Sequence, residues 1–264
     1  MPIFRSSSSK AVSRSKPPLR PVSDFQRTVA DTARGEDSTT RLTSLNPSVL
    51  EDLRRFETGR RAIDALEVLA AAVRHGRNLL LHVKLDDQVL PLTVFAIERL
   101  VHTPLPMSRL LAGPLVTWHV MNVEPARLQL AAPGVKPLLA SDPPPADTTA
   151  VAPAHELAAL GPLLWELALR GSRTSLLPEI AGTMAYRIAP GADLGTLEVS
   201  GHASRAVQRL RKQTANLRDV ASWPGFDHES ASRLLNGLYL QAALVLSRSH
   251  PAATNDMWDG GQKH

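Results

Sequence analysis

The sequence predicts an α+β protein in which a small antiparallel sheet with helices is followed by a mostly α-helical, winged-helix-like domain. Three observations predict this fold class. Residues 79–95 alternate apolar and polar side chains around an acidic turn, as strands of a hairpin do. Between Ala203 and Ser249, apolar residues recur at helical spacing in three segments joined by very short turns. A proline-rich stretch separates these two regions.

This stretch also predicts the division of the chain. It holds six prolines between Ala131 and Pro153, and so many prolines resist helix and strand alike, as in a semi-rigid connector. We therefore expect a disordered basic tail at residues 1–43, an α+β domain at 44–131, a Pro-rich linker at 132–153, a helical winged-helix-like domain at 154–252 and a disordered C-terminus at 253–264.

In the first predicted domain, helical segments precede the strands. Asn46, Pro47 and Ser48 introduce the helical part, whose apolar positions are Leu53, Ile63, Leu66, Leu69 and Val73 and whose end is marked by His75 and Gly76. Strands are then expected at residues 79–85 and 89–95, joined by a turn at Asp86 and Asp87, and at residues 99–102 and 115–123, with a short helix at 107–111.

The second predicted domain opens on a helix. His155 and Glu156 resemble helix-start residues before the apolar run at residues 157–169, because an acid offsets the positive end of the helix dipole. Residues 176–190 follow as a helix and then a strand that carries Tyr186 and Ile188.

The helix-turn-helix pattern begins with a basic amphipathic helix whose apolar stripe includes Ala206, Val207 and Leu210. A short second helix around Leu217 and Val220 ends at Trp223, because Pro224 and Gly225 follow it. Asp227 is typical of an N-cap, and Leu234, Leu235 and Leu238 give the third helix its buried face. A short strand at residues 243–246 follows, and Pro251 ends the regular structure.

Two stretches resemble a known family. Residues 92–104, LTVFAIERLVHTP, look like the hairpin of PATAN-type domains, and residues 216–248 resemble the helical tail that follows in that family. The resemblance implies a bacterial signalling and protein-interaction role, often near roadblock proteins and small Ras-like GTPases. The chain departs from the pattern at Ala96 to Arg99, where the family has a Gly-bearing turn, and in the Pro-rich insertion after Ala131.

The net charge of +5 belongs to the N-terminal tail. Arg5, Lys10, Arg14, Lys16 and Arg20 lie in the first 22 residues without an acid, and the rest of the chain is formally neutral. We interpret this segment as a solvated tail, with a weak electrostatic contact to nucleic acid or anionic lipid as the alternative. No apolar core of a secretory signal follows it, so we expect a cytoplasmic protein.

The sequence indicates no cofactor and no catalytic site. It has no cysteine, no Gly-rich phosphate-binding motif and no G-x-S-x-G nucleophile elbow. His82, His102 and His119 lie on three expected strands and would form a zinc site only if they shared a face and register. Asp86 and Asp87 are interpreted as turn residues rather than an acid–base pair. Trp118, Trp165 and Trp223 are expected in the core or an interface.

We therefore predict a non-enzymatic regulatory or scaffold protein that binds another protein. The resemblance implies a roadblock protein or a small Ras-like GTPase as this partner. The predicted contact residues are Arg209 and Lys212 on the first helix and Arg233, Asn236 and Gln241 on the open face of the third. The alternative is a transcription regulator that inserts the start of the third helix into the major groove. There it would offer His228, Glu229, Ser230 and Arg233, of which few can read a base edge.

Overall fold

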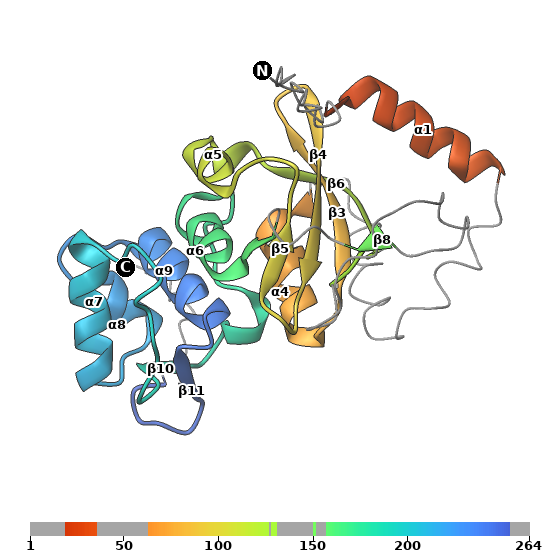
Figure 1. Cartoon of the computed structure of the whole chain (residues 1–264). Helices are drawn as coiled ribbons and strands as arrows, with labels where there is room; N and C mark the ends of the chain where they lie inside the picture. The colour runs from red at the N-terminus through yellow and green to blue at the C-terminus, as the bar shows by residue number, and fades with distance from the viewer. Residues whose placement is uncertain (1–18, 36–62, 127, 131–149, 152–156, 254–264) are drawn as a thin grey trace, which may run out of the picture.

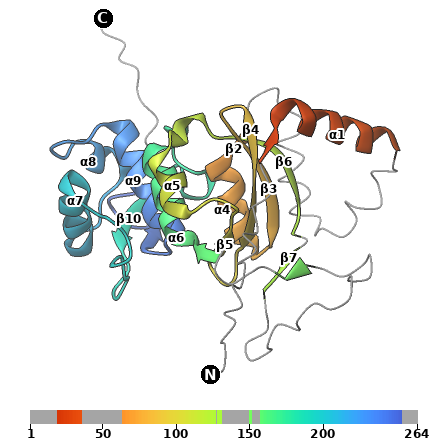
Figure 2. The same ribbon diagram turned by 45° about the horizontal axis from the view of Figure 1, so that its top comes forward.

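The computed structural model describes residues 19–35, 63–126, 128–130, 150–151 and 157–253. Within these ranges the chain is mixed α+β, with an antiparallel sheet in the middle and helices around it (Figure 1). The helix-turn-helix segment lies at one end of the molecule and the first helix, α1, at the other, in both views (Figures 1 and 2). None of the described helices is long and apolar enough to cross a membrane.

The sheet is built around the predicted hairpin. Strand β3 (Leu79–Leu85) pairs with β4 (Gln88–Phe95), and Asp86 and Asp87 form the turn, with Asp86 in the left-handed region at φ +54°. The order across the sheet is β2-β6-β3-β4-β5-β9. It includes β2 (Ile63–Asp64), β5 (Leu100–His102), β6 (His119–Pro125) and β9 (Leu157–Ala159), and β1 (Arg20–Pro21) joins β4 from the side. The predicted hairpin is therefore confirmed.

One face of the sheet forms the main core. Leu81 of β3 and Leu92 of β4 pair across the hairpin and are fully buried. They belong to one hydrophobic cluster with Leu69 of helix α4 (Ala65–His75), which Figure 1 shows on this side of the sheet. Helix α4 ends at His75, and Gly76 follows in the left-handed conformation at φ +58°, as the sequence predicts.

Helix α1 (Val22–Gly35) contacts the other face at its first turn and then extends away from the sheet (Figure 1), and it corrects the prediction of a disordered tail over residues 1–43. Its Phe25 is buried, and the Phe25 ring lies 4.6 Å from the ring of His82 on β3. The composition of the tail hid this helix, because the apolar spacing of Val22, Phe25 and Val29 begins only after the Ser- and Lys-rich stretch. Residues 1–18 and 36–43 lie outside the described residues.

The sheet and the helical end share one core. Strand β9, which the sequence places in the second domain, pairs with β5, and helix α6 (Leu160–Arg170) follows it directly. Helix α6 packs against both α4 and helix α9 (His228–Leu240). Buried residues of the sheet, α4, α6 and α9 form a single hydrophobic cluster. The division at residues 132–153 therefore does not separate two cores.

The helical end follows the predicted order. Helices α7 (Gly201–Lys212), α8 (Leu217–Ala221) and α9 are joined by short turns, and Asp227 caps α9 by accepting a hydrogen bond from the backbone N–H of Ser230. Strand β11 (Leu244–Ser247) follows α9 and pairs antiparallel with β10 (Ala185–Ile188), which precedes α7. The small elements α5 (Met107–Ala112), η1 (Leu115–Thr117), η3 (Pro178–Ile180), β7 (Leu128–Gln129) and β8 (Ala150–Val151) complete the description.

Four predicted boundaries are wrong. Ile63, expected in the helical part, pairs with Val120 as part of β2, and α4 starts at Ala65. The helix expected from His155 starts at Leu160, because residues 157–159 pair with β5 and Pro162 suits the first turn of a helix. The strand expected from Leu115 starts at His119 after a 3₁₀ turn. The helix expected after Leu176 is only a 3₁₀ turn before β10. Leu53, the 46–48 helix start, His155 and Glu156 lie outside the described residues.

Candidate functional site

The third helix of the helix-turn-helix, α9, is enclosed rather than open. It packs against α6 and α8, and most of its residues beyond the first turn are buried. The prediction that Arg233, Asn236 and Gln241 line an open face is therefore wrong in geometry. Each of these side chains makes a contact inside the molecule. The exposed residues of α9 are His228 and Glu229 in its first turn, and Arg233 and Tyr239 are partly exposed.

Arg233 closes the C-terminal end of α6. Its Nη1 donates to the carbonyl oxygens of Leu169 and Gly171, at 2.9 and 2.8 Å. Its guanidinium also pairs with Glu229 one turn earlier, at 2.9 Å. A cation at the last carbonyl groups of a helix stabilises the negative end of the helix dipole. Arg233 thus joins α9 to α6 and has its main donors engaged.

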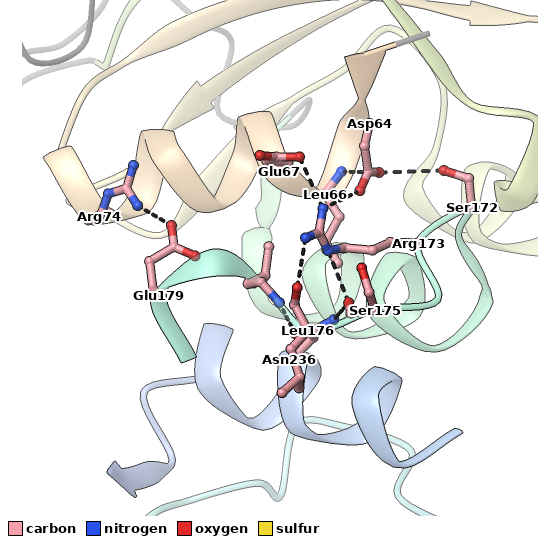
Figure 3. A network of polar contacts seen from close by, with 11 residues as sticks. Asp64, Leu66, Glu67, Arg74, Ser172, Arg173, Ser175, Leu176, Glu179 and Asn236 are labelled. Atoms are coloured by element: carbon pink, nitrogen blue, oxygen red, sulfur yellow. Dashed lines mark hydrogen bonds and ion pairs between the residues drawn. The ribbon is translucent and has the colours of Figure 1, made fainter. Parts of the chain in front are cut away.

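Asn236 is fully buried and joins α9 to the loop that follows α6. Its Oδ1 accepts from the backbone N–H of Leu177 at 2.8 Å, and its Nδ2 donates to the carbonyl oxygen of Ser175 at 2.9 Å. Figure 3 shows this amide on α9 beneath the loop. The side chain replaces backbone partners that an irregular buried loop otherwise lacks.

The same loop is tied to the sheet side through Arg173. Its Nη1 lies 3.4 Å from Asp64 Oδ2 and 3.0 Å from Glu67 Oε2, on the first turn of α4 (Figure 3). Its Nη2 donates to the carbonyl of Leu176 at 2.7 Å. Arg74 of α4 pairs with Glu179 beside it. The loop that Asn236 binds is therefore also bonded to α4. The sequence analysis singled out none of Asp64, Glu67 and Arg173.

Gln241 and Arg99 link the far end of α9 to the sheet and α6. The Gln241 amide donates to the carbonyl of Gly161 at 2.9 Å. Arg99, in the turn before β5, donates to the carbonyl of Leu240 at 2.6 Å and adopts φ +58°. Burial lowers the pKa of Arg99 from its ordinary value. Both ends of α9 are therefore held by long polar side chains.

Helix α7, in contrast, presents a basic face to solvent. His202, Arg205, Arg209 and Lys212 are all exposed, and their spacing of three, four and three residues places them along one side of the helix. Helix α7 contains no acid. Arg211, which is also on α7, does not belong to this face, because its guanidinium donates to the carbonyl of Ala192 at 3.0 Å. We call the four exposed residues the α7 stripe.

A hollow of about 280 Å³ lies beside the α7 stripe. It is lined by three residues of the stripe, by Ala206 and by the turn between α8 and α9. The lining residues are His202, Arg205, Ala206, Arg209, Trp223, Pro224 and Phe226, and Lys212 lies outside the hollow, one turn beyond Arg209. The Arg209 guanidinium carbon lies 4.6 Å from the centre of the Trp223 ring, which is the geometry of a cation–π contact. The hollow thus places an apolar floor next to positive charge.

Gly225 permits the close approach of the turn to α7. It adopts φ +85°, and a Cβ there would lie 2.1 Å from the His202 ring. His202 Nδ1 lies 3.2 Å from the Pro224 carbonyl oxygen and 2.7 Å from an Arg205 Nη. Nδ1 can either donate to the Pro224 carbonyl or accept from Arg205, so His202 lies in contact with both the turn and Arg205 at the edge of the hollow. The sequence indicated Arg209 and the Pro224–Gly225 turn separately, and only the fold brings them together.

Two acidic side chains, Asp227 and Glu229, lie at the start of α9, next to the hollow. Asp227 and Ser230 form a reciprocal capping pair, and Glu229 is exposed. Hydrogen bonds from the Ser230 side chain and from the Ser230 backbone N–H lower the pKa of Asp227 below its ordinary value. Asp227 is therefore ionised at neutral pH, directly after Phe226.

This pKa predicts how the cap responds to pH. Because the folded-state pKa of Asp227 is depressed, its contribution to stability is present above the unfolded pKa of 3.8 and is lost as pH falls through the folded value. Asn at this position keeps the capping oxygen but does not titrate. We expect the wild type to lose thermal stability relative to Asp227→Asn as pH drops below 3.8. Thermal unfolding followed by circular dichroism from pH 7 to about pH 2.5 checks this, and parallel curves would contradict it.

The three sheet histidines do not converge. His82 on β3 faces Pro91 and Asn122 across the sheet, His119 on β6 faces Lys84, and His102 on β5 faces Thr93. In the described ranges, no three His, Cys, Asp or Glu side chains gather as a possible metal site. The buried positions predicted for Trp118, Trp165 and Trp223 are confirmed.

Comparison with protein-family models, with curated proteins and with solved structures gives no match for this chain.

Proposed function

We propose that the chain is a non-enzymatic regulatory or scaffold protein that binds another protein through the α7 stripe and the adjacent hollow. The observation that carries the proposal is the contrast between the two helices. Arg233, Asn236 and Gln241 hold α9 inside the molecule, whereas Arg209 and Lys212 are exposed on α7 and Arg209 lines the hollow. Arginine side chains beside aromatic rings are typical of protein-contact sites, and here Arg209 lies over the buried Trp223 ring.

The order β10, α7, α8, α9, β11, with β10 and β11 paired, supports a winged-helix-like arrangement of this end. With the PATAN-like stretches at residues 92–104 and 216–248, it leads us to place the protein in bacterial intracellular signalling. A roadblock protein or a small Ras-like GTPase in the cytoplasm is the class of partner that this resemblance implies.

A DNA-binding regulator is the second candidate, and the basic α7 stripe is the observation in its favour. The contacts of α9 weigh against it. A recognition helix must enter the major groove with free side chains, but α9 is packed between α6 and α8 and its Arg233 donates to α6 carbonyls. Glu229 at the exposed start of α9 would face phosphate oxygens with the wrong sign.

An affinity capture from native lysate separates the two candidates. The tagged full chain is used as bait with and without nuclease, and bound proteins are read by mass spectrometry. We expect a defined protein that survives nuclease and is lost when the bait carries Arg209→Glu and Lys212→Glu. The control bait is Arg77→Glu, which reverses an exposed charge after α4 on the sheet half. Recovery of DNA, or of proteins only with intact nucleic acid, would favour the regulator.

A further inference from the structure

The α7 stripe carries several positive charges close together. Arg205, Arg209 and Lys212 put three positive charges on one side of α7 over roughly 10 Å of helix. Arg209 lies against Trp223, and an Arg205 Nη lies 2.7 Å from His202 Nδ1, so both guanidinium groups have neighbours within the protein. Within the described parts of the chain, the Lys212 side chain makes no hydrogen bond or ion pair. A ligand of opposite charge would find preorganised partners here.

The hollow is large enough to receive one large side chain. Its volume of about 280 Å³ lies just below the range of about 300–1,000 Å³ that is typical of small-molecule sites. Its floor consists of Ala206, Trp223 and Phe226, which offer no charged group to a ligand. An apolar side chain that leaves water for this floor gains the hydrophobic contribution, while the stripe beside it binds charge.

The same groups fit nucleic acid poorly. Three cations are few compared with the roughly 6–10 phosphate contacts of a salt-sensitive DNA-binding protein. The ionised Asp227 follows Phe226 at the edge of the hollow, and Glu229 lies exposed beyond it. A long polyanion that crosses the stripe would meet these acids, whereas a short segment can avoid them.

We infer that the occupant of the α7 stripe is an acidic peptide segment of a partner protein, with carboxylates on Arg205, Arg209 and Lys212 and one aromatic or large aliphatic side chain in the hollow. Charge complementarity and the apolar floor carry this inference. It rests on the proposed function, because it names the chemistry of the partner at the same site.

Peptide selection on the full chain tests the inference. A random 12-residue library displayed on phage is selected on the immobilised protein at low salt, and enriched peptides are synthesised and measured by fluorescence anisotropy. We expect enriched peptides to carry several Asp or Glu around one Trp, Phe, Leu or Met. Their binding should weaken about tenfold or more with Arg209→Glu or Lys212→Glu, and should also weaken as salt rises.

Matched variants keep the test independent of folding. Lys212→Glu removes a side chain that is exposed, and Arg77→Glu makes the same charge change elsewhere, so Arg77→Glu should bind like the wild type. Replacing the single apolar residue of an enriched peptide with Ser should also abolish binding. Peptides without acidic enrichment, peptides that bind Lys212→Glu as tightly as the wild type, or displacement by a 20-base-pair DNA duplex at equal concentration would overturn the inference.

The outcomes also separate this inference from the proposed function. If the lysate capture yields a nuclease-resistant partner that depends on Arg209 and Lys212 but selection yields no acidic peptides, the proposed function stands and the inference fails. If acidic peptides bind the stripe but capture yields only DNA-dependent proteins, the proposed function fails and the stripe is an acid-binding surface without that role.

Discussion

Replacing Trp165 with alanine should lower the free energy of unfolding by about 3–5 kcal/mol. Trp165 lies in α6, is 1% exposed and sits directly on the backbone of α9. A Cβ at Gly237 of α9 would lie 2.9 and 3.0 Å from two atoms of the Trp165 ring, so α9 has no room for a larger residue there. Removing the ring leaves a cavity in the core that joins the two halves.

Urea unfolding followed by far-ultraviolet circular dichroism measures this loss. Val245→Ala is the control, because Val245 is 47% exposed on β11 and its truncation should change stability by less than about 0.5 kcal/mol. Because sheet and helices share one core, wild type and variant should each unfold in one transition. Two separate transitions, or a loss of unfolding free energy below about 1 kcal/mol, would contradict the conclusion that α6 and α9 pack into one core with the sheet.

Replacing Asn236 with alanine should be the second large loss. The change leaves the N–H of Leu177 and the carbonyl of Ser175 without this partner, and Leu177 is fully buried. A buried polar group that loses its partner costs about 1–3 kcal/mol. The effect should also spread to the Arg173 contacts, because Ser175 and Leu176 lie on the same loop (Figure 3).

Ser232→Ala is the matched control for this substitution. Ser232 is equally buried on α9, but its hydroxyl donates only to the carbonyl of His228 within the same helix. Alanine has the higher helix propensity, so this variant should stay close to the wild type. Urea unfolding midpoints of Asn236→Ala and Ser232→Ala, measured under the same conditions, show whether the Asn236 hydrogen bonds to the loop stabilise the fold. Equal midpoints would show that the Asn236 amide contributes no more than an ordinary buried side chain.

The sequence predicted helices and strands correctly where the apolar periodicity of a segment and its turn or capping residues indicate the same element. The hairpin around Asp86 and Asp87, the end of α4 at Gly76 and the Asp227 cap depend on neighbours in sequence, and the structure has them as expected. The strand β9 is different. Leu157–Ala159 continues an apolar helical pattern, and only its pairing with β5, far away in the chain, makes it extended. Tertiary pairing therefore overrode a local preference.

The candidate site shows the same limit. Helical spacing alone could say that Arg209 and Lys212 share a face, and the structure leaves both exposed. Helical spacing could not predict that Asn236 points inward, because a polar residue is usually at the surface. The backbone N–H of Leu177 and carbonyl of Ser175, which need the Asn236 amide as a hydrogen-bond partner, cannot be recognised in the sequence. The hollow was also invisible, since it needs the contact between α7 and the turn at Gly225.

The most direct measurement of the central claim is the capture experiment with three baits: wild type, Arg209→Glu with Lys212→Glu, and Arg77→Glu. All three are first shown by circular dichroism to have the same melting temperature, and lysates are treated with nuclease. The proposal that α7 binds a partner protein predicts a protein retained by the wild type and Arg77→Glu and lost from the double variant. Equal retention by all three baits would contradict it.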